Sequence, residues 1–142
     1  MDKRIVANEV ILEDAAALMA EGREVTIKPL GYSMLPFIRG GKDSVRMKKM
    51  PTVAVGDMIL VRLPGPRYVL HRLIRKEGDR LTLMGDGNLA GTESCSEADV
   101  LGTVTAIERG KRVVIPGNGL WWRRIPTIVR RYLLAIYRRL FI

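Results

Sequence analysis

The feature that most constrains the fold is a series of short, strand-like apolar runs, the first of which alternates with a period of two residues like a half-buried strand. They cover residues 24–30, 44–48, 58–63, 68–75, 81–84, 100–108 and 112–115. Turn-forming residues separate them, as at Pro64-Gly65-Pro66 and Gly78-Asp79. Short strands at this spacing predict a mainly β fold, either a coiled antiparallel sheet or a partly open barrel.

One helix is predicted at each end of this β region. Apolar residues in 8–21 recur at spacings of three and four, and Gly22 follows as a stop signal. After the turn at 116–119, residues 121–142 predict a basic amphipathic helix with Pro126 near its first turn. Its apolar side is predicted to comprise Ile125, Val129, Tyr132, Leu133, Ile136, Tyr137 and Leu140, opposite the arginines. The chain is thus expected to comprise a domain at 1–120 and a C-terminal helix at 121–142.

The positive charge is concentrated in the C-terminal helix. The formal charge is +9, and residues 121–142 hold six arginines and no acid, which leaves 18 basic and 15 acidic groups in residues 1–120. Nucleic acid is therefore not the expected partner of the domain. Two interpretations of the helix stay open: packing on the domain with the arginines in solvent, or binding to an anionic membrane surface, which Trp121 and Trp122 favour.

Residue counts exclude several kinds of chemistry. Cys95 is the only cysteine and His71 the only histidine, which excludes an internal disulfide, a multi-cysteine zinc site and a histidine cluster. Gly85-x-Gly87 lacks the third glycine of a dinucleotide site, and no cofactor or metal is expected. Neither a membrane-spanning helix nor an export signal is predicted. The expected location is the cytoplasm, with the C-terminal helix as a contact to the inner membrane surface.

A serine and a histidine are the best candidates for catalysis. Ser33 lies in Gly31-Tyr32-Ser33-Met34-Leu35-Pro36, where a predicted strand meets a turn, and a serine needs a neighbouring base to become a nucleophile. His71 lies at the centre of the predicted strand 68–74. Taken singly, each residue has an ordinary structural explanation. The segment 84–88, which contains Asp86, also has an ordinary explanation, because by itself it is typical of a hairpin turn.

Five segments in this order resemble the S24/S26 serine peptidases, which include signal peptidases and LexA-type self-cleaving repressors. They are GYSMLP at 31–36, VGDMILV at 55–61, VLHRLI at 69–74, GDGN at 85–88 and VLGTV at 100–104. Most bacterial relatives have a lysine where His71 falls. His71 followed by Arg72 looks like the Ser/His subset formed by archaeal and endoplasmic-reticulum signal peptidases. The first helix and the arginine-rich end look like those of small stand-alone bacterial members.

The resemblance implies that Ser33 attacks a peptide carbonyl, that His71 is the general base, and that the Ser33 backbone N–H helps to bind the oxyanion. Gly31 stands where many signal peptidases carry an additional hydroxyl group. The resemblance also implies an acid that orients the histidine, at a set distance after the aspartate of the GDGN segment. In this sequence that position is Thr92. Asp86 is the conservative choice, with Glu93 as the alternative.

The sequence thus predicts a serine endopeptidase that cleaves an extended peptide through an acyl-enzyme. Its expected substrate is a cytosolic protein or the leader segment of a modified peptide, bound as an added strand. The competing hypothesis is a catalytically weak or inactive peptide-binding module that has kept the fold and is tethered to a membrane by its C-terminal helix.

Overall fold

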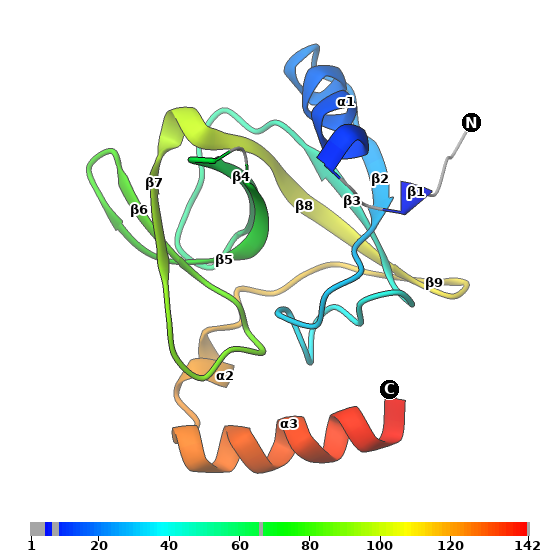
Figure 1. The fold of residues 1–142 in the computed structure, drawn as a ribbon, viewed down its shortest axis with the longest axis vertical. Helices are drawn as coiled ribbons and strands as arrows, with labels where there is room; N and C mark the ends of the chain where they lie inside the picture. Colours follow the sequence, from blue (N-terminus) through cyan, green and yellow to red (C-terminus); the bar gives the residue numbers. More distant parts are fainter. Residues whose placement is uncertain (1–4, 7–8, 66, 142) are drawn as a thin grey trace.

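A computed structural model describes residues 5–6, 9–65 and 67–141, which form one open sheet of nine strands with helices at opposite ends of the long axis (Figure 1). The sheet order is β1-β2-β3-β8-β4-β5-β6-β7, with β9 paired to β8. All pairs are antiparallel except β1 with β2. The mainly β, open antiparallel architecture predicted from the sequence is confirmed. The strands are β1 (Ile5–Val6), β2 (Val25–Lys28), β3 (Ser44–Lys48), β4 (Met58–Leu63), β5 (Arg67–Glu77), β6 (Arg80–Met84), β7 (Glu93–Ser96), β8 (Val100–Arg109) and β9 (Arg112–Val114).

The first helix, α1 (Glu9–Ala20), is confirmed, and the predicted start at Asn8 lies outside the described residues. Gly22 follows it with φ +86°, a conformation that favours glycine. The helix packs on β8 at Gly102, where an added Cβ would lie 2.3 Å from Met19 Sδ. A larger residue here would have to displace the end of the Met19 side chain, so glycine lets the helix lie close to the sheet.

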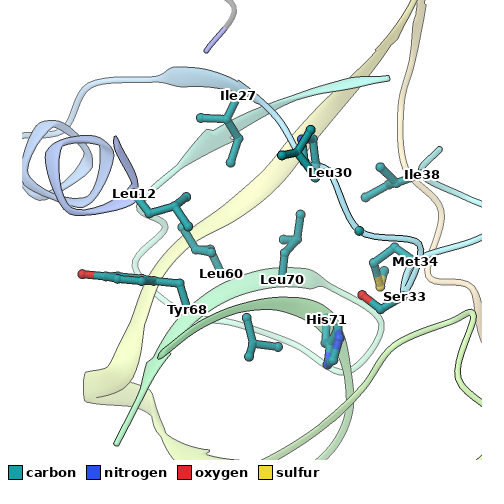
Figure 2. A pocket seen from close by; sticks show the side chains of 13 residues that line it. Leu12, Ile27, Leu30, Ser33, Met34, Ile38, Leu60, Tyr68, Leu70 and His71 are labelled. Carbon is teal, nitrogen blue, oxygen red and sulfur yellow. The ribbon is translucent and has the colours of Figure 1, made fainter. Parts of the chain in front are cut away.

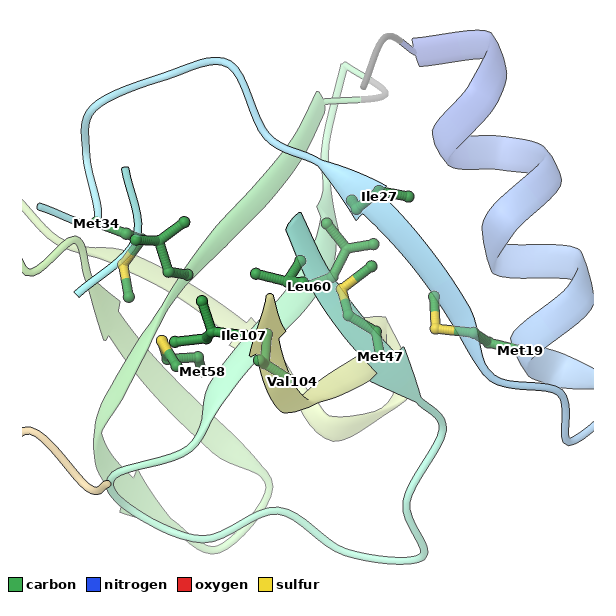
Figure 3. Close-up of a cluster of buried hydrophobic side chains, with 10 residues drawn as sticks. Met19, Ile27, Met34, Met47, Met58, Leu60, Val104 and Ile107 are labelled. Carbon is green, nitrogen blue, oxygen red and sulfur yellow. The ribbon is translucent and has the colours of Figure 1, made fainter. Parts of the chain in front are cut away.

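Strand β4 shows how alternation builds the core. Met58 and Leu60 belong to one buried apolar cluster, which also holds Met19 from α1 and is drawn in Figure 3. Ile59 and Val61 belong to a second cluster. Successive side chains of a strand point to opposite faces, so the run MILVRL is buried on both sides of the sheet. This strand and its neighbours form a rigid sheet, and the loops extend from its ends.

Strand β7 was not predicted, because residues 93–96 (ESCS) lack the alternation of a half-buried strand. It pairs only with β6, at one edge of the sheet. Edge strands are commonly short and polar, since one side of the backbone stays unpaired.

The C-terminal segment differs from the single helix predicted at 121–142. It forms α2 (Leu120–Arg123) and α3 (Thr127–Phe141), separated just before Thr127 by Pro126, which has no N–H with which to continue the hydrogen-bond ladder of α2.

The inner face of α3 also differs from the prediction. Arg130 and Leu134 are buried, whereas most of the predicted apolar side is exposed. Arg130 turns inward because its guanidinium donates to the Ile125 carbonyl and the Thr127 hydroxyl, and Leu134 packs with Leu35.

No helix among the described residues combines the length and the apolar character needed to cross a bilayer.

Candidate active site

Ser33 lies in the loop that joins β2 to β3, and its neighbours hold that loop from two sides. Met34 and Ile38 enter the main apolar cluster, while Leu35 is completely buried against Trp122 and Leu134. Ser33 itself is half-buried and lines a pocket. The loop is therefore held between the sheet and the C-terminal helices, with the Ser33 side chain turned to the pocket.

His71 lies in β5 and is 8% exposed. Its Nδ1 atom lies 2.6 Å from Oε1 of Glu93, at the start of β7. Strand β6 separates β5 from β7 in the sheet, so the Glu93 side chain reaches past the end of β6. A short contact of this kind between a carboxylate and an imidazole orients the ring and leaves its other nitrogen free for proton transfer.

Gly85 brings the serine loop and the histidine together. An added Cβ at Gly85 would lie 2.4 Å from the Ser33 carbonyl oxygen and 3.1 Å from His71 Nε2. The Gly87 N–H donates to the same Ser33 carbonyl at 2.7 Å. Figure 2 shows Ser33 and His71 at one end of the pocket, with Leu12 and Tyr68 at the other. The nucleophile candidate and the base candidate thus face one site.

Two features of Ser33 bear on catalysis. In the described part of the chain, its Oγ makes no hydrogen bond to His71, a contact that in many enzymes tightens only when substrate binds. Its backbone N–H likewise makes no hydrogen bond to any described residue. That N–H is available to a ligand oxygen, as an oxyanion donor must be.

The pocket has a volume of about 210 Å³ and is mainly apolar. Sites for whole small molecules are commonly larger, about 300–1,000 Å³, so this one suits one or two side chains of a longer ligand. Beside it, residues 67–71 of β5 pair with β4 on one side, while the pairing of β5 with β6 begins only at Arg72. Within the described residues, β6 does not pair with 69–71, which run along the pocket.

Asp86, the first choice for the acid that orients His71, makes no hydrogen bond to His71 among the described residues. Its carboxylate is fully buried and binds Arg72, with Oδ2 2.6 Å from Nη2, and also Arg123, with Oδ1 3.3 Å from Nη2. Two guanidinium groups therefore hold the carboxylate away from the imidazole. Thr92, on which the family offset falls, is exposed, and the carboxylate at His71 is Glu93.

Arg72 joins several segments that pack beside the site. It donates to the carbonyls of Gly56 and Gly117, both at 2.8 Å, and its guanidinium lies 5.0 Å from the centroid of the Phe37 ring. An added Cβ at Gly119, where φ is +67°, would lie 2.5 Å from its Cζ. Burial and these partners give Arg72 a structural role, beside the histidine that precedes it.

The C-terminal segment supports the same loop, which the sequence did not predict. Trp122 is 3% exposed, and its Nε1–H donates to the Asp86 carbonyl at 2.7 Å. Arg123 donates to the Met84 carbonyl at 3.0 Å. Burial lowers the pKa of Arg123, and the Asp86 carboxylate opposes that shift. The only sequence signal for these contacts was an indole and an arginine within an otherwise amphipathic segment.

Comparison with models of known families and with curated proteins found no match for this chain.

Proposed function

We propose that this protein is a serine endopeptidase in which Ser33 is the nucleophile, His71 the general base and Glu93 the residue that orients His71. The observation that carries the proposal is the 2.6 Å contact between His71 Nδ1 and Glu93 Oε1, in a histidine that shares a pocket with Ser33. A carboxylate, an imidazole and a hydroxyl in this order are the parts of a catalytic triad.

In the proposed reaction, His71 Nδ1–H donates to Glu93, and Nε2 accepts the proton of Ser33 Oγ as the oxygen bonds to the substrate carbonyl carbon. The Ser33 N–H stabilises the negative charge that develops on the carbonyl oxygen. As the C–N bond breaks, His71 passes the proton to the leaving amine. Water then attacks the acyl-enzyme with His71 again as base, which releases the acid product and restores the serine hydroxyl.

An extended peptide is the proposed substrate. Residues 69–71 of β5, with which β6 does not pair, offer backbone groups to an added strand that would run along the pocket. The apolar lining, which includes Leu30, Leu60 and Leu70, would accept an aliphatic side chain. The S24/S26 resemblance of the sequence agrees with this substrate class.

The first test is labelling with a fluorophosphonate probe, which reacts preferentially with an activated serine. Wild-type protein should be labelled at Ser33, as located by peptide mass spectrometry. Ser33→Ala should abolish labelling, His71→Ala should reduce it by about 10²-fold or more, and Glu93→Gln should slow it substantially. Ser94→Ala is the matched control, because Ser94 is exposed on β7 and lies outside the pocket.

The second test is cleavage of a broad library of quenched peptides by the same variants. Cleavage by wild type and by Ser94→Ala, lost in Ser33→Ala, would support the peptidase. If the folded protein binds peptides but neither reacts with the probe nor cleaves any of them, the proposal fails and the peptide-binding module replaces it.

A further inference from the structure

Helix α3 contacts the domain through a narrow face. Arg130 and Leu134 are 7% and 4% exposed, and Tyr137, the next residue on that side, is half-buried. Leu134 packs with Leu35 and Trp122. Residues spaced by three and four lie on one side of a helix, so these three positions define the docked side and leave the opposite side uncovered.

The uncovered side of α3 carries an apolar stripe beside its exposed arginines. We call it the outer face; its members are Ile128, Val129, Tyr132, Leu133, Ile136 and Leu140, all exposed. Tyr132 is 69% exposed and Leu140 is 71% exposed. Trp121, 59% exposed, adds an indole at the start of the same C-terminal segment. Large exposed apolar surfaces on a folded domain commonly mark an interface.

The charges at the outer face indicate what covers it. Arg124, Arg131, Arg138 and Arg139 are exposed, and the sequence holds no acidic residue after Glu108. In a dimer formed through this face, two sets of arginines would meet without an acid from either helix to pair with them. Nucleic acid would pair with the arginines but would leave the apolar side chains against water or phosphate. An anionic bilayer satisfies both, with acyl chains for the apolar residues and headgroups for the arginines.

We propose that the outer face of α3 binds the surface of a bilayer containing anionic lipids, with the helix axis lying in the plane of the membrane interface. The buried contacts of Leu134 and Trp122 remain in place, so binding requires no unfolding of α3 from the domain.

This arrangement has a consequence for the pocket. Leu35 packs directly on the inner side of α2 and α3, and Ser33 lies two residues before it in the same loop. A membrane-bound molecule would therefore hold the loop of Ser33 one layer of side chains away from the helix that touches the lipid. The consequence for substrate access rests on the proposed peptidase function, whereas the membrane binding itself does not.

The test is sedimentation of the full-length protein with vesicles of phosphatidylcholine alone or with about one third phosphatidylglycerol. We expect binding to the anionic vesicles only, weakening as salt is raised and the Debye length falls to about 8 Å at 0.15 M. Arg138→Gln with Arg139→Gln should weaken binding about 20- to 30-fold at low salt, since each arginine near the surface contributes about fivefold. Arg112→Gln, on exposed β9, is the matched control and should bind like wild type.

The apolar contribution is tested with Tyr132→Ser and Ile136→Ser combined, against Ile115→Ser, an exposed isoleucine outside the helices. Vesicle binding should be lost in the first variant and kept in the second, and both should melt like wild type.

Equal binding to neutral and anionic vesicles, no binding, or identical losses in both variants would overturn the proposal. The proposal would also be overturned if sedimentation velocity showed that the wild type is a dimer, that the outer-face variant is a monomer, and that neither protein binds vesicles. Probe labelling of Ser33 without vesicles is independent of these results, so failure of one proposal can be told from failure of the other.

Discussion

Arg72 Nη2 lies 2.6 Å from Asp86 Oδ2, and the two side chains are only 1% and 0% exposed. This buried ion pair joins the residue that follows His71 to the loop that packs on Ser33. Asp86, two residues beyond the end of β6, therefore stabilises the loop at the site. Glu93, on the next strand, contacts the imidazole of His71.

Asp86→Asn should destabilise the protein by about 3–5 kcal/mol, because it leaves the buried Arg72 without a compensating charge. Glu93→Gln should change stability by less than about 1 kcal/mol, since Glu93 is partly exposed at a sheet edge. Urea unfolding of both variants measures the two effects. Equal stability losses would mean that Asp86 does not support the fold in the way its contacts indicate.

Gly85→Ala should displace the serine loop, because the new methyl group would lie 2.4 Å from the Ser33 carbonyl oxygen. The expected cost is about 1–3 kcal/mol, as for other overpacked sites, accompanied by loss of probe labelling. Gly117→Ala is the control, since an added Cβ there meets nothing within 4 Å. Wild-type labelling by Gly85→Ala would contradict the close approach at this residue.

Trp122→Phe should cost about 1–3 kcal/mol, because it removes the indole donor from the buried carbonyl of Asp86. Trp121→Phe should be nearly neutral in the absence of membranes, because Trp121 is mostly exposed and a phenyl ring keeps part of its contact with Phe37. Thermal melting of the two variants without lipid separates them. Matching melting temperatures would show that the hydrogen bond contributes little.

Asp43 predicts a component of acid unfolding. Burial by itself would raise the pKa of this carboxyl group, but hydrogen bonds from Arg39 and Arg109 outweigh it and hold the pKa below its ordinary value of 3.8. A carboxylate whose pKa is depressed in the folded state stabilises the protein above the unfolded pKa, and this stability is lost as pH falls through the folded pKa. The stability difference between wild type and Asp43→Asn should therefore be constant above about pH 5 and shrink below about pH 4.

Urea unfolding of wild type and Asp43→Asn at a series of pH values measures this difference. A difference that already shrinks between neutral pH and about pH 5 would assign the effect to another group.

The thiol of Cys95 should be slow to react. Burial, with smaller contributions from Asp99 and Asp79, raises its pKa to about 11. Because the thiolate is the reactive form, iodoacetamide should modify the folded protein about tenfold faster for each pH unit between roughly 7 and 10. In urea the rate should instead level off above about pH 9, as for an ordinary thiol. A plateau in the folded protein near pH 8 would contradict the raised pKa.

The strand series could be predicted from the sequence because strands depend on local patterns, whereas the catalytic pairing of Ser33 with His71 came from the order of the motifs and stays a prediction. The apolar run at 58–63 placed β4, and the order of the motifs singled out one serine and one histidine. Strand β7 could not be found in this way, since ESCS has only one apolar residue, Cys95, and so cannot produce an alternation.

Tertiary structure alone shows that Glu93, and not Asp86, contacts His71. Neighbouring residues of an extended chain point to opposite sides, so a shift of one position separates an exposed Thr92 from a Glu93 bound to His71. The side of α3 that packs inward was decided in the same way. Periodicity identified an apolar stripe, but the surface formed by Leu35 and Trp122 selected Leu134, leaving the stripe itself exposed.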